Sequence, residues 1–258
     1  MSSRLRTLAF LLLLAGYVLL LGCPGIQGQE FRAVRVPFVG CASDGQNGAE
    51  PPPNGAARLI LIDANAAERL AYYEIAYEDQ GVLAPLGWYC FGLHGSGGFD
   101  MFVAPQPMKY EDFASRSPRR FAGPVIELNL ITSAASGRIE AARIIARMFP
   151  AQKAFVQLII RGGILPSDIP FGPYPHDELV SQSDRLVEYQ TPPHSEGLGT
   201  DSQFLQANGE PINGAAILQG HDVTILNVRL QSNMSYLTPG IIHQFERENR
   251  GRSAKQMH

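Results

Sequence analysis

The chain has 258 residues, of which 45% are hydrophobic and 17% are charged. This length suits one large domain or two small ones, and the apolar content excludes a wholly disordered chain. The formal net charge of −3 excludes a strongly basic surface, so no nucleic-acid partner is expected.

The N-terminus has the composition of an export signal. Residues 1–7 carry two arginines and no acidic residue, and residues 8–22 carry no charge. This uncharged run is about fifteen residues long, shorter than the roughly twenty that a membrane-spanning helix needs. We therefore predict a signal peptide over residues 1–22, with an uncleaved anchor helix as the alternative. Removal of this leader changes the formal charge from −3 to −5.

The segment Leu20-Leu21-Gly22-Cys23 resembles a bacterial lipobox, in which a small residue precedes the cysteine that receives lipid. The resemblance implies lipidation of Cys23 and a periplasmic or outer-membrane lipoprotein that touches the membrane only through this anchor. Leu21 is bulkier than the residue usual at its position. Cleavage near Gly28 would instead give an ordinary secreted protein.

Removal or lipidation of Cys23 leaves two cysteines, Cys41 and Cys90. In an oxidising compartment these two are expected to form a disulfide. In the chain-entropy model, closing a loop of about 49 residues lowers the conformational entropy of the unfolded chain and so stabilises the folded state by roughly 4 kcal/mol. A free reactive thiol is the alternative, although the chain has no Cys-x-x-Cys motif.

The first third of the mature chain predicts strands and one short helix. Alternating apolar residues predict a strand over 32–39, and the apolar run at 58–62 predicts another. Asn65 stands three residues before Glu68, which is typical of a capping box and predicts a helix through Tyr77.

Residues 86–93 and 99–103 are rich in aromatic and β-branched residues, and Gly95-Ser96-Gly97-Gly98 separates them. This pattern predicts a β-hairpin. The elements expected after it are strands over 125–131, 186–189, 215–218 and 223–230, and helices over 137–148, 150–160 and 238–248. Strands outnumber helices and do not alternate with them, which favours an α+β fold. We expect a mixed or antiparallel sheet with hairpins, about four helices, many loops and one disulfide.

The expected organisation has four parts. After the signal peptide at 1–22, residues 23–56 form a lead-in with a strand and a Pro/Gly-rich loop. Residues 57–248 form a single α+β domain that includes the strand at 32–39. A mobile basic tail follows over 249–258.

The segment His94–Gly98 resembles the oxyanion loop of some lipases, and a serine between glycines resembles the nucleophile loop of trypsin-like proteases. The lipase motif Gly-x-Ser-x-Gly does not occur in the chain, and Gly95 stands where the proteases have an aspartate. The glycines are what a hairpin turn requires, so we interpret the segment as a turn. The alternative is a serine-type hydrolase that uses Ser96, with His94 or His221, and with Asp222 or Glu188.

The polar loop region over 188–201 is expected to border any pocket where it meets the hairpin at 87–98. The candidate binding residues are Trp88, Tyr89, His94, Glu188 and His194. The six histidines lack metal-ligand spacing and no glycine-rich phosphate loop occurs, so neither a metal nor a cofactor is expected. We predict an exported cell-envelope protein that binds an unknown envelope partner or small ligand without catalysis.

Overall fold

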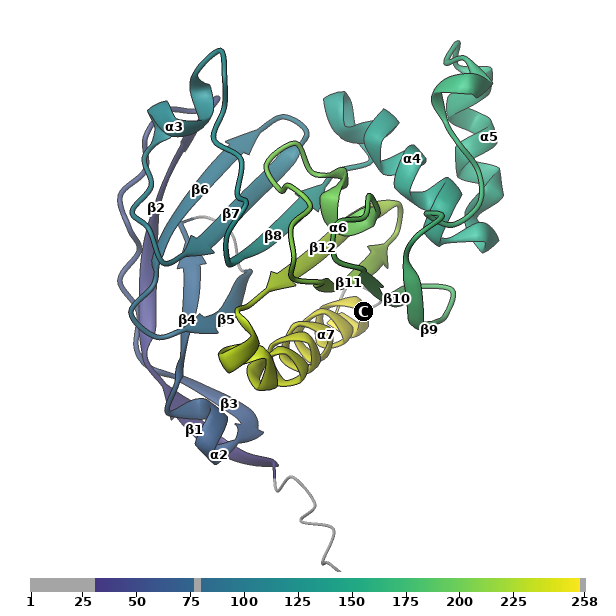
Figure 1. Cartoon of the computed structure of the whole chain (residues 1–258). Helices are drawn as coiled ribbons and strands as arrows, with labels where there is room; N and C mark the ends of the chain where they lie inside the picture. The colour runs from purple at the N-terminus through teal and green to yellow at the C-terminus, as the bar shows by residue number, and fades with distance from the viewer. Residues whose placement is uncertain (1–30, 77–79, 256–258) are drawn as a thin grey trace, which may run out of the picture. The chain divides into compact units, whose positions relative to one another are not determined.

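The computed structural model describes residues 31–76 and 80–255. In these residues a mixed sheet runs in the order β5-β4-β2-β6-β7-β8-β12-β11-β10-β9, and β1 pairs with β3 in a separate two-stranded sheet (Figure 1). The strands are β1 (Phe31–Val36), β2 (Phe38–Gly45), β3 (Arg58–Asp63), β4 (Leu70–Ile75), β5 (Gly81–Pro85), β6 (Tyr89–Gly95), β7 (Gly98–Ala104), β8 (Val125–Ile131), β9 (Glu178–Gln182), β10 (Leu186–Thr191), β11 (Ile212–Gln219) and β12 (Asp222–Arg229).

The described part of the chain holds six α-helices, three of them with seven or more residues, so the expectation of about four was too low. Helices α2, α3 and α6 are single turns, too short to show the periodic apolar stripe that predicts a helix. Helix α7 continues past residue 248, where its end was expected. The helices are α2 (Ala64–Ala67), α3 (Tyr110–Ala114), α4 (Arg138–Met148), α5 (Lys153–Arg161), α6 (Leu198–Asp201) and α7 (Thr238–Lys255), with 3₁₀ turns at Ala135–Gly137, Pro150–Gln152, Pro166–Asp168 and Ser232–Leu237.

The predicted hairpin is confirmed: β6 and β7 are antiparallel, and Gly95 pairs with Gly98. Gly98 has a φ of 135°, and a Cβ atom there would lie 1.7 Å from the carbonyl oxygen of Leu130. The close approach of β8 therefore requires glycine at this position, apart from any chemistry of the neighbouring Ser96.

The predicted helix from Asn65 through Tyr77 is wrong beyond its first turn. Asp63 caps α2, since its Oδ1 accepts from the backbone N–H groups of Asn65 (2.9 Å) and Ala66 (3.1 Å). The chain then enters β4, which is parallel to β2 and antiparallel to β5. Sheet pairing on both sides, with Tyr73 fully buried, outweighs the local helix signal.

The predicted strand over 32–39 is divided at Pro37, which lacks a backbone N–H for a sheet ladder. Before the proline, β1 pairs with β3. After it, β2 continues to Gly45 inside the large sheet, between β4 and β6.

The predicted Cys41–Cys90 disulfide is present, with the two Cα atoms 5.3 Å apart. It links β2 to β6, which run parallel as neighbours from Ala42 and Phe91 onward. Sheet, helices and disulfide together confirm the α+β class. In the described residues, no helix is long and apolar enough to cross a membrane.

The two faces of the sheet differ. Helix α7 lies beside the large sheet (Figure 1), and it contacts β5, β11 and β12. Its apolar residues belong to the same core as those of the three strands. On the opposite face, α4 contacts β8 and β12, and α6 contacts β10 and β11. The apolar residues of this second face form two separate clusters. Polar side chains occupy the strip of sheet between the clusters.

Candidate functional site

A row of polar side chains crosses the second face of the sheet on strands β7, β8, β12 and β10. The strand register places Asp100 opposite Asn129, and Glu127 opposite Asn227. We call this set the polar row; its members are Asp100, Asn129, Glu127, Asn227 and Tyr189.

A chain of hydrogen bonds runs through the polar row. The Tyr189 hydroxyl donates to Asn227 Oδ1 (2.5 Å), and Asn227 Nδ2 donates to Glu127 Oε2 (2.8 Å). Ser202, the residue after α6, donates its hydroxyl to Glu127 Oε1 (2.5 Å). Both oxygens of the fully buried Glu127 carboxyl are therefore hydrogen-bonded.

The other end of the polar row is incompletely satisfied. Asn129 Nδ2 donates to Asp100 Oδ1. Asn129 Oδ1 is buried and has no hydrogen-bond partner among the described residues. An unpaired buried acceptor is unfavourable by about 1–3 kcal/mol, so this atom is a preferred position for a ligand donor.

A cavity of about 520 Å³ opens onto the polar row between the β6–β7 hairpin, the start of α4 and residues 201–204. We call it the hairpin pocket. The loop region that was expected to border a pocket reaches it at Asp201. The polar side chains that line the pocket are His94, Asp100, Asn129, Ser136, Glu140, Arg143, Asp201, Ser202 and Gln203.

A neighbouring cavity of about 750 Å³ shares Asp201 with the hairpin pocket and is lined by Arg120, Arg147 and His176. Its Tyr174 hydroxyl already donates to Asp201 Oδ2 (2.6 Å). The hairpin pocket is the smaller of the two, but its wall carries the unpaired acceptor of Asn129 and also Ser202, whose hydroxyl donates to the buried carboxyl group of Glu127. We therefore take the hairpin pocket as the candidate site.

Carboxyl groups dominate the electrostatics of this pocket. Burial raises the pKa of Asp100 well above its usual value, and the nearby Glu127 raises it further. Burial also raises the pKa of Glu127 to about 7, against the opposing effects of the hydrogen bonds from Ser202 and Asn227 and of the Arg229 charge. The pKa of Glu140 is raised by burial and by Asp201. Such perturbed carboxyl groups in a cleft are typical of functional sites.

Arg229 fixes the wall that carries Ser202. It is 1% exposed, and its guanidinium donates to the carbonyl oxygens of Phe121, Gly123 and Gln206. Burial lowers the pKa of Arg229 to about 10, so it is still a cation at neutral pH and favours the anion of Glu127.

The structure separates the residues of the serine-type site that was the alternative to a turn. Ser96 lies at the hairpin tip with its hydroxyl 2.8 Å from that of Ser136. His221 is exposed and stacks on Phe155, with the ring centroids 4.2 Å apart. Asp222 accepts from the backbone N–H (2.6 Å) and hydroxyl (2.7 Å) of Ser133, and Glu188 accepts from Ser181. Among the described residues, no hydrogen bond joins Ser96 to His94, His221, Asp222 or Glu188.

The predicted binding residues also lie in different places. His94 lines the hairpin pocket, where its Nε2 is buried without a hydrogen-bond partner among the described residues. Trp88 lines a separate cavity of about 460 Å³ with Tyr236, and Tyr89 is exposed on β6. Glu188 faces α7 on the opposite side of the sheet. Its neighbour Val187 packs in the cluster on the pocket side, and adjacent residues of a strand point to opposite faces. His194 is exposed in the loop after β10, with a φ of 58°.

Sequence reasoning missed the polar row, although its signal was present. Glu127 and Asn129 stand two apart in the apolar strand β8, and Asn227 and Arg229 stand two apart in β12. Because side chains two apart in a strand share a face, each pair marks a polar site on a buried face. The part of the chain that the structure describes contains no group of three or more His, Cys, Asp or Glu side chains that could hold a metal ion.

Comparison of the chain with protein-family models, with curated proteins and with solved structures found no match. The chemistry of the hairpin pocket is therefore the basis on which function has to be inferred. That pocket offers hydrogen-bond acceptors on a buried wall and a serine hydroxyl bound to a buried carboxyl group.

Proposed function

We propose that this chain is an exported protein that binds a small polar ligand in the hairpin pocket. The observation that carries the proposal is the unpaired, buried Oδ1 of Asn129 on the pocket wall. A ligand hydroxyl, amide or ammonium group that donates to this atom removes the penalty of an unsatisfied acceptor. The acidic rim formed by Glu140 and Asp201 also favours ligands that carry donors over anionic ones.

The test is a thermal-shift screen of the mature protein against monosaccharides, free amino acids and small amines, followed by calorimetry of any that bind. Replacing Asn129 by serine shortens the acceptor and should weaken binding about tenfold, which corresponds to 1.4 kcal/mol. Asn213→Ser is the matched control, because Asn213 Oδ1 already accepts from Gln190 Nε2 (2.7 Å) and does not line the pocket. Equal affinities for Asn129→Ser and the unaltered protein would contradict the proposal.

The proposed location is the cell envelope, as a lipoprotein or as a secreted protein. The leader and Cys23 lie outside the described residues, and the support comes from the Cys41–Cys90 disulfide, which is typical of an oxidising compartment. If Cys23 is acylated, Cys23→Ala should move the protein from the membrane fraction to the soluble fraction. Unchanged partitioning, with a mature N-terminus near Gly28, would favour ordinary secretion.

A further inference from the structure

We propose that the hairpin pocket also hydrolyses an ester of a small polar alcohol, with Ser202 as nucleophile, Glu127 as its general base and Asp100 as the donor to the oxyanion. The inference rests on the proposed function, because a substrate must enter the same pocket, and it adds a reaction to binding.

The first support is the geometry around Ser202. Ser202 lines the pocket, and its Oγ lies 2.5 Å from Glu127 Oε1, the separation of a strong hydrogen bond from a hydroxyl to a carboxylate. Asn227 holds the other carboxyl oxygen at 2.8 Å and is held in turn by Tyr189. A nucleophile, a base and a group that orients the base are the three parts of an activated hydroxyl.

The second support is the different surroundings of the two carboxyl groups. Glu127 accepts two hydrogen bonds and lies near the cation of Arg229, which favours its ionised form. Asp100 is partly buried and faces the charges of Glu127 and Glu140, which favours its neutral form against the opposing effect of the hydrogen bond from Asn129. A neutral carboxyl group is a hydrogen-bond donor, so Asp100 Oδ2 can donate to an oxyanion in the pocket.

The reaction follows from these protonation states. Ser202 Oγ bonds to the ester carbonyl carbon, its proton moves to Glu127, and the carbonyl oxygen becomes an oxyanion that accepts the hydrogen bond of Asp100. Collapse breaks the bond to the alcohol, which leaves with the proton from Glu127. Water then adds to the acyl-serine and gives a proton to Glu127. A second collapse releases the carboxylic acid and returns that proton to Ser202.

The reaction should speed up as the pH rises through the pKa of Glu127, which burial raises to about 7. Only the ionised carboxylate accepts the serine proton. The titratable and charged groups that interact with Glu127 from the surrounding elements are Asp100 on β7, Arg229 on β12, Tyr189 on β10 and Glu140 on α4, and Asp201 on α6 acts in turn on Glu140.

The experiment is labelling of the mature protein with a fluorophosphonate, with the modified residue mapped by mass spectrometry. We expect the phosphonyl group on Ser202, and a labelling rate that rises about tenfold in total between pH 6 and pH 8, as the ionised fraction of a base with a pKa of about 7 rises from about one tenth to about nine tenths. Glu127→Gln keeps the size of the base but removes its charge, and should slow labelling at least tenfold and flatten the pH profile. A merely structural Glu127 would change stability and leave the pH profile of labelling as it was.

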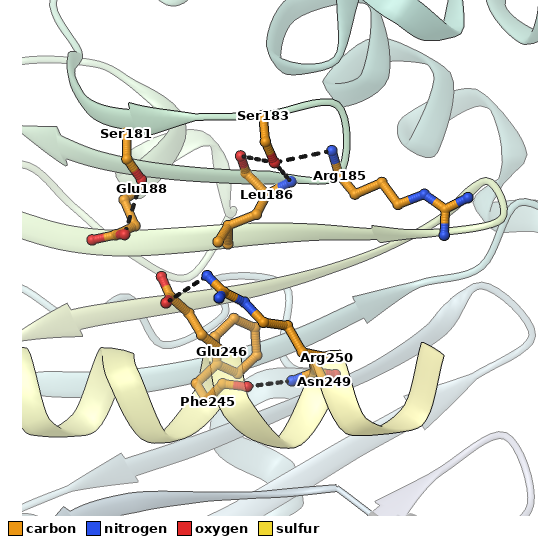
Figure 2. Close-up of polar contacts among 9 residues, drawn as sticks. All are labelled: Ser181, Ser183, Arg185, Leu186, Glu188, Phe245, Glu246, Asn249 and Arg250. Carbon is orange, nitrogen blue, oxygen red and sulfur yellow. Dashed lines mark hydrogen bonds and ion pairs between the residues drawn. The ribbon is translucent and has the colours of Figure 1, made fainter. Parts of the chain in front are cut away.

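Ser181 is the matched control, because its hydroxyl also donates to a glutamate, Glu188 (2.9 Å), but on an exposed strand away from the pocket (Figure 2). It should not be labelled, and Ser181→Ala should leave the labelling of Ser202 unchanged. Absence of label on Ser202 of the unaltered protein, or equal labelling of Ser181, would overturn the inference without requiring any variant to fold. Ligand binding that depends on Asn129 would in that case leave the proposed function standing.

Discussion

Gly214 leaves the space that Tyr189 needs to reach Asn227 and form their hydrogen bond in the polar row. It lies between Tyr189 and Asn227 in the strand register, so the tyrosine ring has to pass over it to reach the asparagine. A Cβ atom at this position would lie 2.5 Å from Tyr189 Oη and 2.6 Å from the carbonyl oxygen of Leu226. The glycine is therefore needed for space.

Replacing Gly214 by alanine should destabilise the protein by about 1–3 kcal/mol, the usual effect of overpacking a core. The displaced Tyr189 would also release Asn227 from its position behind Glu127. Urea denaturation measures the change. Gly123→Ala is the control, since no atom lies within 4 Å of the added methyl group, and it should shift stability by less than about 0.5 kcal/mol. Equal midpoints for the two variants would show that Tyr189 can move without loss.

At the level of single residues, the sequence could predict the β6–β7 turn, but it could not predict which residues come together in the hairpin pocket. Four glycines in seven positions identify the β6–β7 turn locally. The pocket forms where that turn meets Ser202, a residue about a hundred positions further along the chain, and no local pattern encodes this approach. The strand spacing of Glu127 and Asn129 indicates a shared face, but only the sheet order reveals that Asp100 and Asn227 lie on either side.

The same contrast holds for helices and strands. Helices α4 and α5 were predicted closely, because their apolar residues recur at helical spacing and Gly162 ends the second one. Strand β4 was predicted as helix because its pairing with β2 and β5 comes from distant segments. Strand β9, at the edge of the sheet, has five exposed residues, so no alternation marks it in the sequence.

Helix α7 carries a buried carboxyl group against the sheet. Glu246 is 5% exposed, and its Oε2 lies 3.4 Å from Nη2 of Arg250 (Figure 2). Burial and the facing Glu188 raise the pKa of Glu246 to about 7, and Arg250 opposes the shift. The folded protein therefore holds a proton that the unfolded chain releases at lower pH.

This proton makes the packing of α7 dependent on pH. Between the ordinary glutamate pKa of about 4.5 and about 7, the folded state binds more protons than the unfolded state, so stability falls as the pH rises. Glu246→Gln keeps the neutral form at every pH. Its free energy of unfolding, relative to the unaltered protein, should rise through this window by an amount on the order of 1–3 kcal/mol.

Urea denaturation at pH 4.5, 6 and 8 measures this difference. Comparing the variant with the unaltered protein cancels the parallel contributions of Asp100, Glu127 and Asp177, whose pKa values are also raised by burial. Glu178→Gln, at an exposed position of β9, is the control and should leave the profile unchanged. A constant offset between the Glu246→Gln variant and the unaltered protein at all three pH values would refute the argument.

At the scale of the whole molecule, the disulfide joins two parts of the large sheet. Cys41 on β2 is the last residue of the segment that pairs with β4, and Cys90 lies on β6, the first strand of the antiparallel run that ends at β9. The 49-residue separation encloses β3, α2, β4 and β5 in one loop. The sequence could predict this bond from the parity of the cysteines, but it could not show that the bond connects neighbouring parallel strands.

Loss of the disulfide should cost about 4 kcal/mol in the chain-entropy model, a large part of the roughly 5–15 kcal/mol that stabilises a typical domain. Because this contribution belongs to the closed loop, either Cys41→Ser or Cys90→Ser alone should remove all of it, and the double variant should be only slightly less stable than each. Urea denaturation of the three variants, with the single ones alkylated, tests this. If the two single losses added up in the double variant, the stabilisation would come from the packing of each sulfur atom, and the buried Cys41 would account for more of it than the partly exposed Cys90.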